Sequence, residues 1–300
     1  MNEKTEETVP GIRVLYEDRH IAVVEKPVGV LAEGTSPAPA KKPAASPKKK
    51  KDEPQKAPSA GTSGIRKDSG TPDIVSLLAQ RAGTPDGEDA WYAPVHRLDC
   101  AVGGAMALAK KPYAAAVLSE ALRERGENVK KEYLCIVSGV FSEKEGTLRD
   151  LLIHDARQNK TFIADRMRAG VREAVLSYRV LAEASCGGSP ISLLCVTLGT
   201  GRSHQIRVQF SSRSHPILCD GKYGGRRPAG AEGGGIALWS FHLAIPHPVN
   251  LSRTADGRRE NPNAPRFPDI DAYSLPQTDA LPWSLFAETL DDLRRRFDIR

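Results

Sequence analysis

Short apolar runs bounded by turn residues dominate this chain, which is the pattern of a β-rich protein. Two such runs near the start, 12–16 and 21–25, flank the polar sequence EDRH and predict a hairpin. Further strands are predicted at 96–99, 104–111, 132–141, 161–165, 174–184, 190–199 and 236–248.

Helical spacing of apolar residues is found in four places. The clearest is 112–126, which begins at Pro112 and ends at Gly126 with one apolar stripe between them. The others are 71–83, 202–214 and 282–297. Because most strands follow one another without an intervening helix, we expect an α+β fold: a large mixed, mainly antiparallel sheet with flanking helices.

The composition changes abruptly over 35–70, where Pro, Ala, Lys, Ser and Gly replace almost every large apolar residue. Within it, 41–67 has nine Lys/Arg and two Asp/Glu, and the resulting net charge of +7 exceeds the +6 of the whole chain. Such a segment cannot bury enough surface to order itself. We therefore expect a tail at 1–10, a folded domain formed by 11–34 and 71–300, and a disordered basic insertion between its two parts. The insertion is either an electrostatic arm for a polyanion or a solvated linker.

The remaining composition is that of a cytoplasmic protein. No apolar run approaches the ~20 residues that span a bilayer, and the polar, acidic start predicts neither a signal nor a transit peptide. Five scattered cysteines without a C-x-x-C pair predict reduced thiols. Residues 92–220 carry 18 Lys/Arg against 13 Asp/Glu, which is compatible with a phosphate-rich partner.

An aspartate stands in the apolar context APVHRLDCAVGG, where burial makes a charge costly. Asp99 either caps a turn before Gly103 and Gly104 or does chemistry beside a cation. The segment TGRSHQIRVQF offers that cation, because a helix there would present Arg207 on the face of His204. The alternative for such an arginine is an ordinary surface ion pair.

Tyr133, beside Lys130 and Lys131, either packs in the core or stacks on a nucleobase. The histidines lack metal-ligand spacing, so no metal site is expected. The glycine tract GGRRPAGAEGGG lacks the ending of a phosphate loop. Ser203 and His204 are neighbours, which disfavours a hydrolase triad.

The order of five segments resembles the RluA-type RNA pseudouridine synthases. These segments are VLYEDRHIAVVEKPVGV, VHRLD, KKEYLCIVSGVF, GTGRSHQIRVQFSSRSHPILCDGKYGG and LWSFHLAIPHP. The resemblance runs from about Gly11 to Val249 and is interrupted by the basic insertion. It implies a catalytic domain that isomerises uridine to pseudouridine in ribosomal or transfer RNA within a central cleft, without a cofactor or metal.

The resemblance also implies roles for individual residues. Asp99 falls on the catalytic aspartate and Tyr133 on the tyrosine that stacks on the target base and assists proton removal. Arg207 falls on the arginine that pairs with the aspartate, with Arg202 as the second candidate. Arg97 matches a residue that fills the gap left by the extruded nucleotide. The RNA-binding candidates are Arg97, His96, Arg202, His204 and Lys131. We expect a monomer with RNA as its partner, no membrane association and no protein partner; the alternative is an RNA-binding or folding factor whose activity has decayed.

Two features depart from the family pattern. Val102 and Gly103 stand where relatives have threonine and serine, and the two lost hydroxyls predict a looser loop after Asp99. Only about ten residues precede the first predicted strand, so no separate S4-type RNA-binding domain is expected.

Overall fold

The computed structural model describes residues 12–34, 71–81, 91–124, 129–251 and 266–299. Its strands are β1 (Arg13–Glu17), β2 (Ile21–Lys26), β3 (Ala93–Pro94), β4 (Gly103–Ala109), β5 (Lys130–Ser138), β6 (Glu145–Asp155), β7 (Lys160–Ile163), β8 (Val171–Cys186), β9 (Ser189–Leu198), β10 (Leu238–Ile245) and β11 (Ile270–Tyr273). Its helices are α1 (Ile74–Arg81), α2 (Pro112–Glu124), α3 (Gln205–Ser211), α4 (Pro248–Leu251) and α5 (Ala287–Arg296), with 3₁₀ turns η1 (Gly221–Tyr223) and η2 (Trp283–Phe286).

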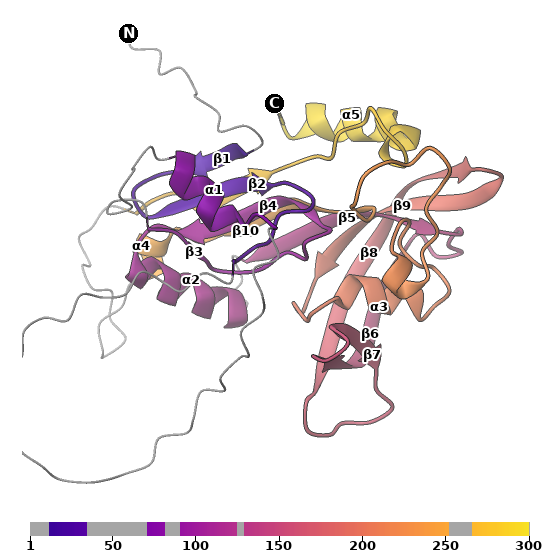
Figure 1. Ribbon diagram of the computed structural model, residues 1–300, viewed down its shortest axis with the longest axis horizontal. Helices are drawn as coiled ribbons and strands as arrows, with labels where there is room; N and C mark the ends of the chain where they lie inside the picture. Colours follow the sequence, from indigo (N-terminus) through magenta and orange to yellow (C-terminus); the bar gives the residue numbers. More distant parts are fainter. Residues whose placement is uncertain (1–11, 35–70, 82–90, 125–128, 252–265, 300) are drawn as a thin grey trace, which may run out of the picture.

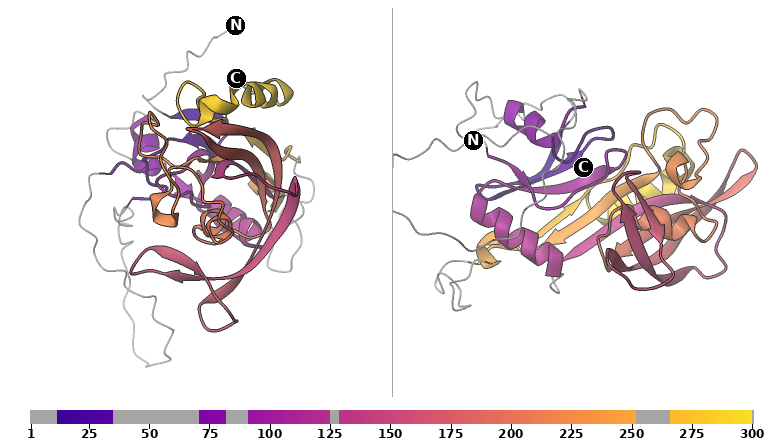
Figure 2. Two further views of the ribbon diagram at one scale, coloured as in Figure 1. Left: turned by 90° about the vertical axis from the view of Figure 1, so that its right-hand side faces the viewer. Right: turned by 60° about the horizontal axis from the view of Figure 1, so that its bottom comes forward.

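Within the described ranges the eleven strands form one sheet in the order β1-β2-β4-β10-β5-β9-β8-β6-β7, with β3 on β4 and β11 on β10. Only the pairing of β4 with β10 is parallel among them. The α+β prediction of a mixed, mainly antiparallel sheet is therefore confirmed. Figure 2 shows that β6, β7 and β8 curl away from the plane of β2, β4 and β10.

Strand β4 is buried on both faces, and its sequence explains how. Its small residues, among them Ala105 and Ala107, join a cluster with Leu118 of α2. The larger Met106 and Leu108 alternate with them and pack on the opposite face, in the cluster that contains Leu78 of α1. Because side chains alternate across a strand, α1 and α2 cover opposite faces of the sheet at this point (Figure 1).

The two segments that flank the predicted insertion are hydrogen-bonded to each other. The N–H of Leu31 donates to the carbonyl of Pro72 (2.9 Å), and the N–H of Ile74 donates to the carbonyl of Leu31 (2.9 Å). The chain therefore leaves the domain and re-enters it at one place. The predicted tail and insertion themselves, 1–10 and 35–70, lie outside the described residues.

Several sequence predictions were wrong in detail. HRLD, predicted as a strand, lies in the loop between β3 and β4, where the buried Val95 and Leu98 anchor irregular backbone rather than a strand face. The predicted helix 202–214 is only α3, because His204 adopts a left-handed conformation (φ 52°) immediately before it. Strands β3, β6 and β11 were not predicted. None of the helices in the described part of the chain is both long and apolar enough to cross a membrane.

Candidate active site

The loop that carries Asp99 is tied to the sheet by backbone hydrogen bonds on two sides. The N–H of Gly29, after β2, donates to the carbonyl of Cys100 (2.8 Å). The N–H of Ile236, before β10, donates to the carbonyl of Ala101 (3.1 Å). The side chain of Asp99 keeps 30% of its surface exposed. A fixed loop thus presents a carboxylate that a substrate can reach.

Lys26, at the end of β2, is a buried cation under this loop that sequence reasoning missed. Its Nζ donates to the carbonyls of Val30 (2.7 Å) and Cys100 (3.4 Å). Burial lowers its pKa to about 8, and the nearby Cys100 and Asp99 act in the other direction. Its signal in the sequence is a lysine that directly follows the apolar run 21–25.

The glycine that replaces serine in the Asp99 loop is explained by its neighbour. A Cβ at Gly103 would overlap the ring of Trp239, which lies opposite it where β4 and β10 pair. The next residue, Gly104, has φ +111°, and its Cβ would overlap the backbone of Ser240. The tryptophan ring occupies the space of the missing serine side chain, and the looser loop stays a prediction.

The side chain of Arg207 in α3 bridges two carboxylates. Its Nη1 donates to Oδ2 of Asp99 at 2.7 Å, so the predicted contact is present. Its Nε and Nη2 donate to the two oxygens of Asp220 at 2.7 and 2.8 Å. Burial alone would lower the pKa of Arg207, but the hydrogen bonds from its guanidinium to the two carboxylates have the larger effect. The pKa is therefore raised above its usual value, and the guanidinium is charged. Asp220 is completely buried and therefore fixes the arginine rather than meeting substrate.

Tyr133 in β5 is buried at 7% exposure beside Asp99. Burial raises the pKa of its phenol above the usual value, and the negative charge of Asp99 raises it further, while a hydrogen bond with Ser240 acts to lower it. The tyrosine is therefore a neutral phenol in the free protein. Asp99, Arg207 and Tyr133 come from three separate elements and meet at one place.

The other RNA-binding candidates differ in their surroundings. His96 Nε2 accepts the N–H of Ala107 (3.1 Å), and burial, with a smaller effect of Lys131, lowers its pKa well below the usual value. Its ring therefore holds β4. Arg202 donates to the carbonyl of Glu173 (3.0 Å) rather than to Asp99. Arg97 is exposed next to Asp99, and no other described residue pairs with it.

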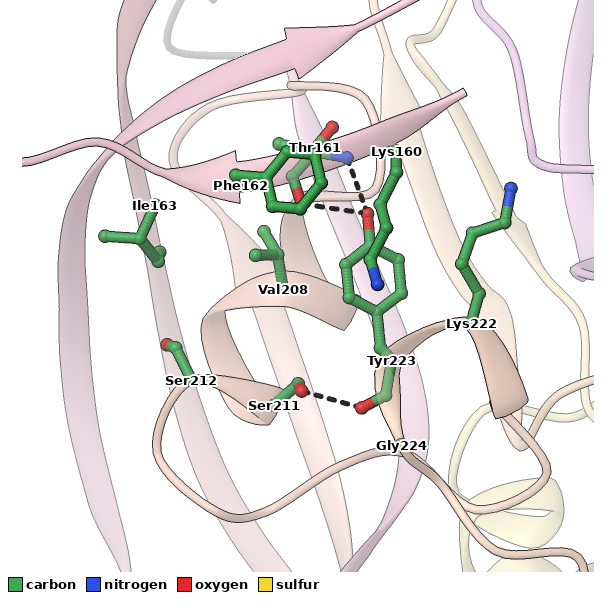
Figure 3. A pocket seen from close by; sticks show the side chains of 10 residues that line it. All are labelled: Lys160, Thr161, Phe162, Ile163, Val208, Ser211, Ser212, Lys222, Tyr223 and Gly224. Carbon is green, nitrogen blue, oxygen red and sulfur yellow. Dashed lines mark hydrogen bonds between the residues drawn. The ribbon is translucent and has the colours of Figure 1, made fainter. Parts of the chain in front are cut away.

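A pocket of about 360 Å³ lies beside Tyr223, a further residue that sequence reasoning did not assign (Figure 3). Lys160 of β7 and Lys222 of η1 line it. The Lys160 ammonium lies 5.2 Å and the Arg207 guanidinium 5.1 Å from the centre of the Tyr223 ring. The Tyr223 ring thus contacts one cation that lines the pocket and one that belongs to the Asp99 site.

The arrangement provides a partly exposed carboxylate, a guanidinium that is held in place and a buried phenol. Within the described ranges, no group of three or more His, Cys, Asp or Glu side chains is placed to bind a metal ion. Such a set is suited to acid–base or nucleophilic chemistry on a substrate that supplies its own leaving group.

Comparison with known proteins identifies the family. The model of the RNA pseudouridylate synthase family matches residues 20–212. The dual-specificity RNA pseudouridine synthase RluA of Yersinia pestis is 31% identical over 235 residues, covering 78% of this chain and 92% of that protein. This chain therefore belongs to the RNA pseudouridine synthase family, and to its RluA type.

Two further relatives extend the comparison. The uncharacterized RNA pseudouridine synthase YhcT of Bacillus subtilis (strain 168) is 30% identical over 212 residues, 71% of this chain, and the match spans 57% of that relative's length. The structure of human RNA Pseudouridylate Synthase Domain Containing 1 superimposes with a TM-score of 0.61 at 20% identity, covering 98% of this chain and 97% of that one. The fold is therefore that of pseudouridylate synthase domains.

Proposed function

We propose that this chain isomerises specific uridines of RNA to pseudouridine, with Asp99 as the catalytic carboxylate. The observation that carries the proposal is the 2.7 Å contact between Asp99 and the buried Arg207, made by a carboxylate that remains 30% exposed. Charge pairing offsets the cost of covering the carboxylate when RNA excludes water. Membership of the family supplies the reaction class.

The reaction breaks the bond between N1 and C1′ of the target nucleotide and joins C5 to C1′. The hydrogen on C5 leaves as a proton and N1 gains one, so atoms balance without a co-reactant. Asp99 acts on the ribose, either by attack on C1′ or by removal of a ribose proton. Tyr133 supports the freed uracil and assists loss of the C5 proton. The uridine must be extruded from the RNA to reach these groups, which favours unpaired loops.

We propose ribosomal or transfer RNA as the substrate and a cytoplasmic monomer as the working form. The name of one relative supports ribosomal RNA, since it is a ribosomal large subunit pseudouridine synthase of Buchnera aphidicola subsp. Baizongia pistaciae. The excess of basic residues over 92–220 suits a phosphate backbone. Arg97, which is exposed two residues before Asp99, is our candidate for the residue that fills the space of the extruded nucleotide.

The test uses purified protein with unmodified ribosomal and transfer RNA transcripts that carry tritium at C5 of uridine. Turnover releases tritium to water because the C5 hydrogen is lost. We expect release by the native chain and none by Asp99→Asn, with RNA affinity within a few-fold of the native value. Asp291→Asn, in an exposed ion pair on α5, is the matched control and keeps native activity.

Pseudouridine mapping of cellular RNA with and without the protein names the site. Release of tritium by Asp99→Asn would refute the role of the aspartate. Tight RNA binding by the native chain without release from any transcript would favour a decayed RNA-binding factor.

A further inference from the structure

Two histidine contacts connect the Asp99 site with the wall of the neighbouring pocket. Nδ1 of His204 lies 2.9 Å from the hydroxyl of Tyr223, and its Nε2 lies 3.6 Å from Oδ2 of Asp99. The same hydroxyl accepts the N–H of Thr161 in β7 (2.7 Å) and lies 3.2 Å from the carbonyl of Thr161 (Figure 3). All these groups except Asp99 are buried.

Burial lowers the pKa of His204 well below its usual value, so the ring is neutral and has a single N–H. The charge of Asp99 acts to raise that pKa, whereas those of Arg207, Lys222 and His154 act to lower it. The question is therefore which of the two nitrogens carries the hydrogen.

The Tyr223 hydroxyl has one hydrogen and already accepts from Thr161. If it donates to Nδ1, the shorter of its two remaining contacts, the ring hydrogen is on Nε2 and points at Asp99. If Nδ1 carries the hydrogen instead, the lone pair of Nε2 faces a carboxylate oxygen in a partly buried site, which is repulsive. Repulsion by the Asp99 carboxylate therefore favours the form of His204 with its hydrogen on Nε2.

The two oxygens of Asp99 then differ. Oδ2 accepts from Arg207 at 2.7 Å and faces the Nε2 of His204. No hydrogen-bond donor among the described residues contacts Oδ1. An oxygen free of donors is the better nucleophile or base, while the oxygen that is held sets the rotation of the carboxylate.

We infer that His204 is a positioning residue: oriented by Tyr223, it presents Nε2–H to Oδ2 of Asp99 and so turns Oδ1 toward the substrate. The inference rests on the proposed function for its consequence but not for its geometry. The 3.6 Å separation is longer than a hydrogen bond, and we expect it to shorten when RNA excludes water from the site.

The first test needs no RNA. Nitrogen-15 NMR of histidine-labelled native protein at pH 7 distinguishes the two tautomers, and the resonances of His204 are those missing from the His204→Gln spectrum. We expect the Nε2–H form. A predominant Nδ1–H form would overturn the inference whatever the enzyme's reaction is.

The second test compares two amides at position 204. In His204→Gln the amide nitrogen replaces Nε2 and can still donate to Asp99, whereas in His204→Asn the amide reaches only the position of Nδ1 and its contact with Tyr223. We expect kcat for tritium release to fall about tenfold further in the Asn variant, with KM unchanged in both.

Backbone preference makes this order informative. Asn tolerates the left-handed conformation of His204 better than Gln does, so a purely structural role would leave the Asn variant the more active. That reversed order would overturn the inference. Absence of release by the native chain would refute the proposed function, and the tautomer measurement would still decide this one.

Discussion

Replacing Asp220 by asparagine tests whether the buried carboxylate fixes the arginine of the site. Asparagine keeps the shape but loses the charge, and its amide group places a donor against one of the two Arg207 nitrogens that now donate at 2.7 and 2.8 Å. Breaking a buried ion pair from one side costs about 3–5 kcal/mol, because the partner charge is left buried. Arg207 retains its 2.7 Å contact with Asp99, so we expect the lower end, about 3 kcal/mol.

Urea denaturation measures this cost. For a slope of about 3 kcal/mol per molar, the midpoint falls by about 1 M. Asp291→Asn is the control, because its partner Arg294 lies at 2.6 Å in an ion pair with both side chains more than 40% exposed, and such pairs contribute about 0.5 kcal/mol or less. Tritium release, assayed well below the unfolding temperature, should also fall, since Arg207 keeps its contact with Asp99 but loses the second carboxylate that fixes the orientation of its guanidinium. A midpoint shift no larger than that of the control, with native activity, would refute the reasoning.

Three further predictions follow from contacts elsewhere in the fold. Gly103→Ser should destabilise the protein by about 1–3 kcal/mol in the same denaturation assay, because the added side chain overlaps Trp239, and the loss should shrink in a double variant with Trp239→Ala. Burial alone would raise the pKa of Glu132, but the hydrogen bond from His242 and the neighbouring ammonium lower it to about 2. The contribution of Glu132 to stability is therefore complete above pH 4.5 and is lost as the pH falls toward 2. Glu132→Gln should flatten this part of the plot of stability against pH, and an unchanged slope would contradict the pairing. Deletion of 35–70 should leave the thermal midpoint unchanged, since its flanks are hydrogen-bonded together, while RNA affinity weakens and its salt dependence flattens; equal salt slopes would make the segment a spacer.

The sequence predicted the fold class and most of the strands that carry a clear apolar run, but it missed β3, β6 and β11. In β6 only Leu152 is fully buried, and its other large apolar residues, Leu148, Leu151 and Ile153, do not alternate regularly with polar ones. The period-2 signal is therefore weak, even though β6 pairs with β8 over nine positions. What places β6 is its neighbour in the sheet, which no local pattern reveals. For HRLD the error was the reverse, because a strand was predicted where the structure has a loop. Buried apolar residues can anchor a loop as well as a strand.

The residues of the candidate site also differ in whether the sequence could predict them. Charged residues in an apolar context, Asp99 and Arg207, could be selected from the sequence, since their burial cost signals a partner. Asp220 could not, because a carboxylate beside glycines in a turn-rich segment is ordinary until α3 brings Arg207 against it. The roles of His204 and Tyr223 depend on hydrogen-bond directions, which exist only once the ring and the hydroxyl share a site.

The sharing of one guanidinium between two carboxylates has a consequence for how such a protein would lose its activity over evolution. Asp99 is partly exposed and accepts one hydrogen bond from Arg207, so its loss costs little stability. Asp220 is wholly buried and accepts two, so its loss threatens the fold. Drift without selection for turnover would therefore erase Asp99 first and leave Arg207 and Asp220 as a remnant pair. This chain retains all three residues, as the proposed activity requires.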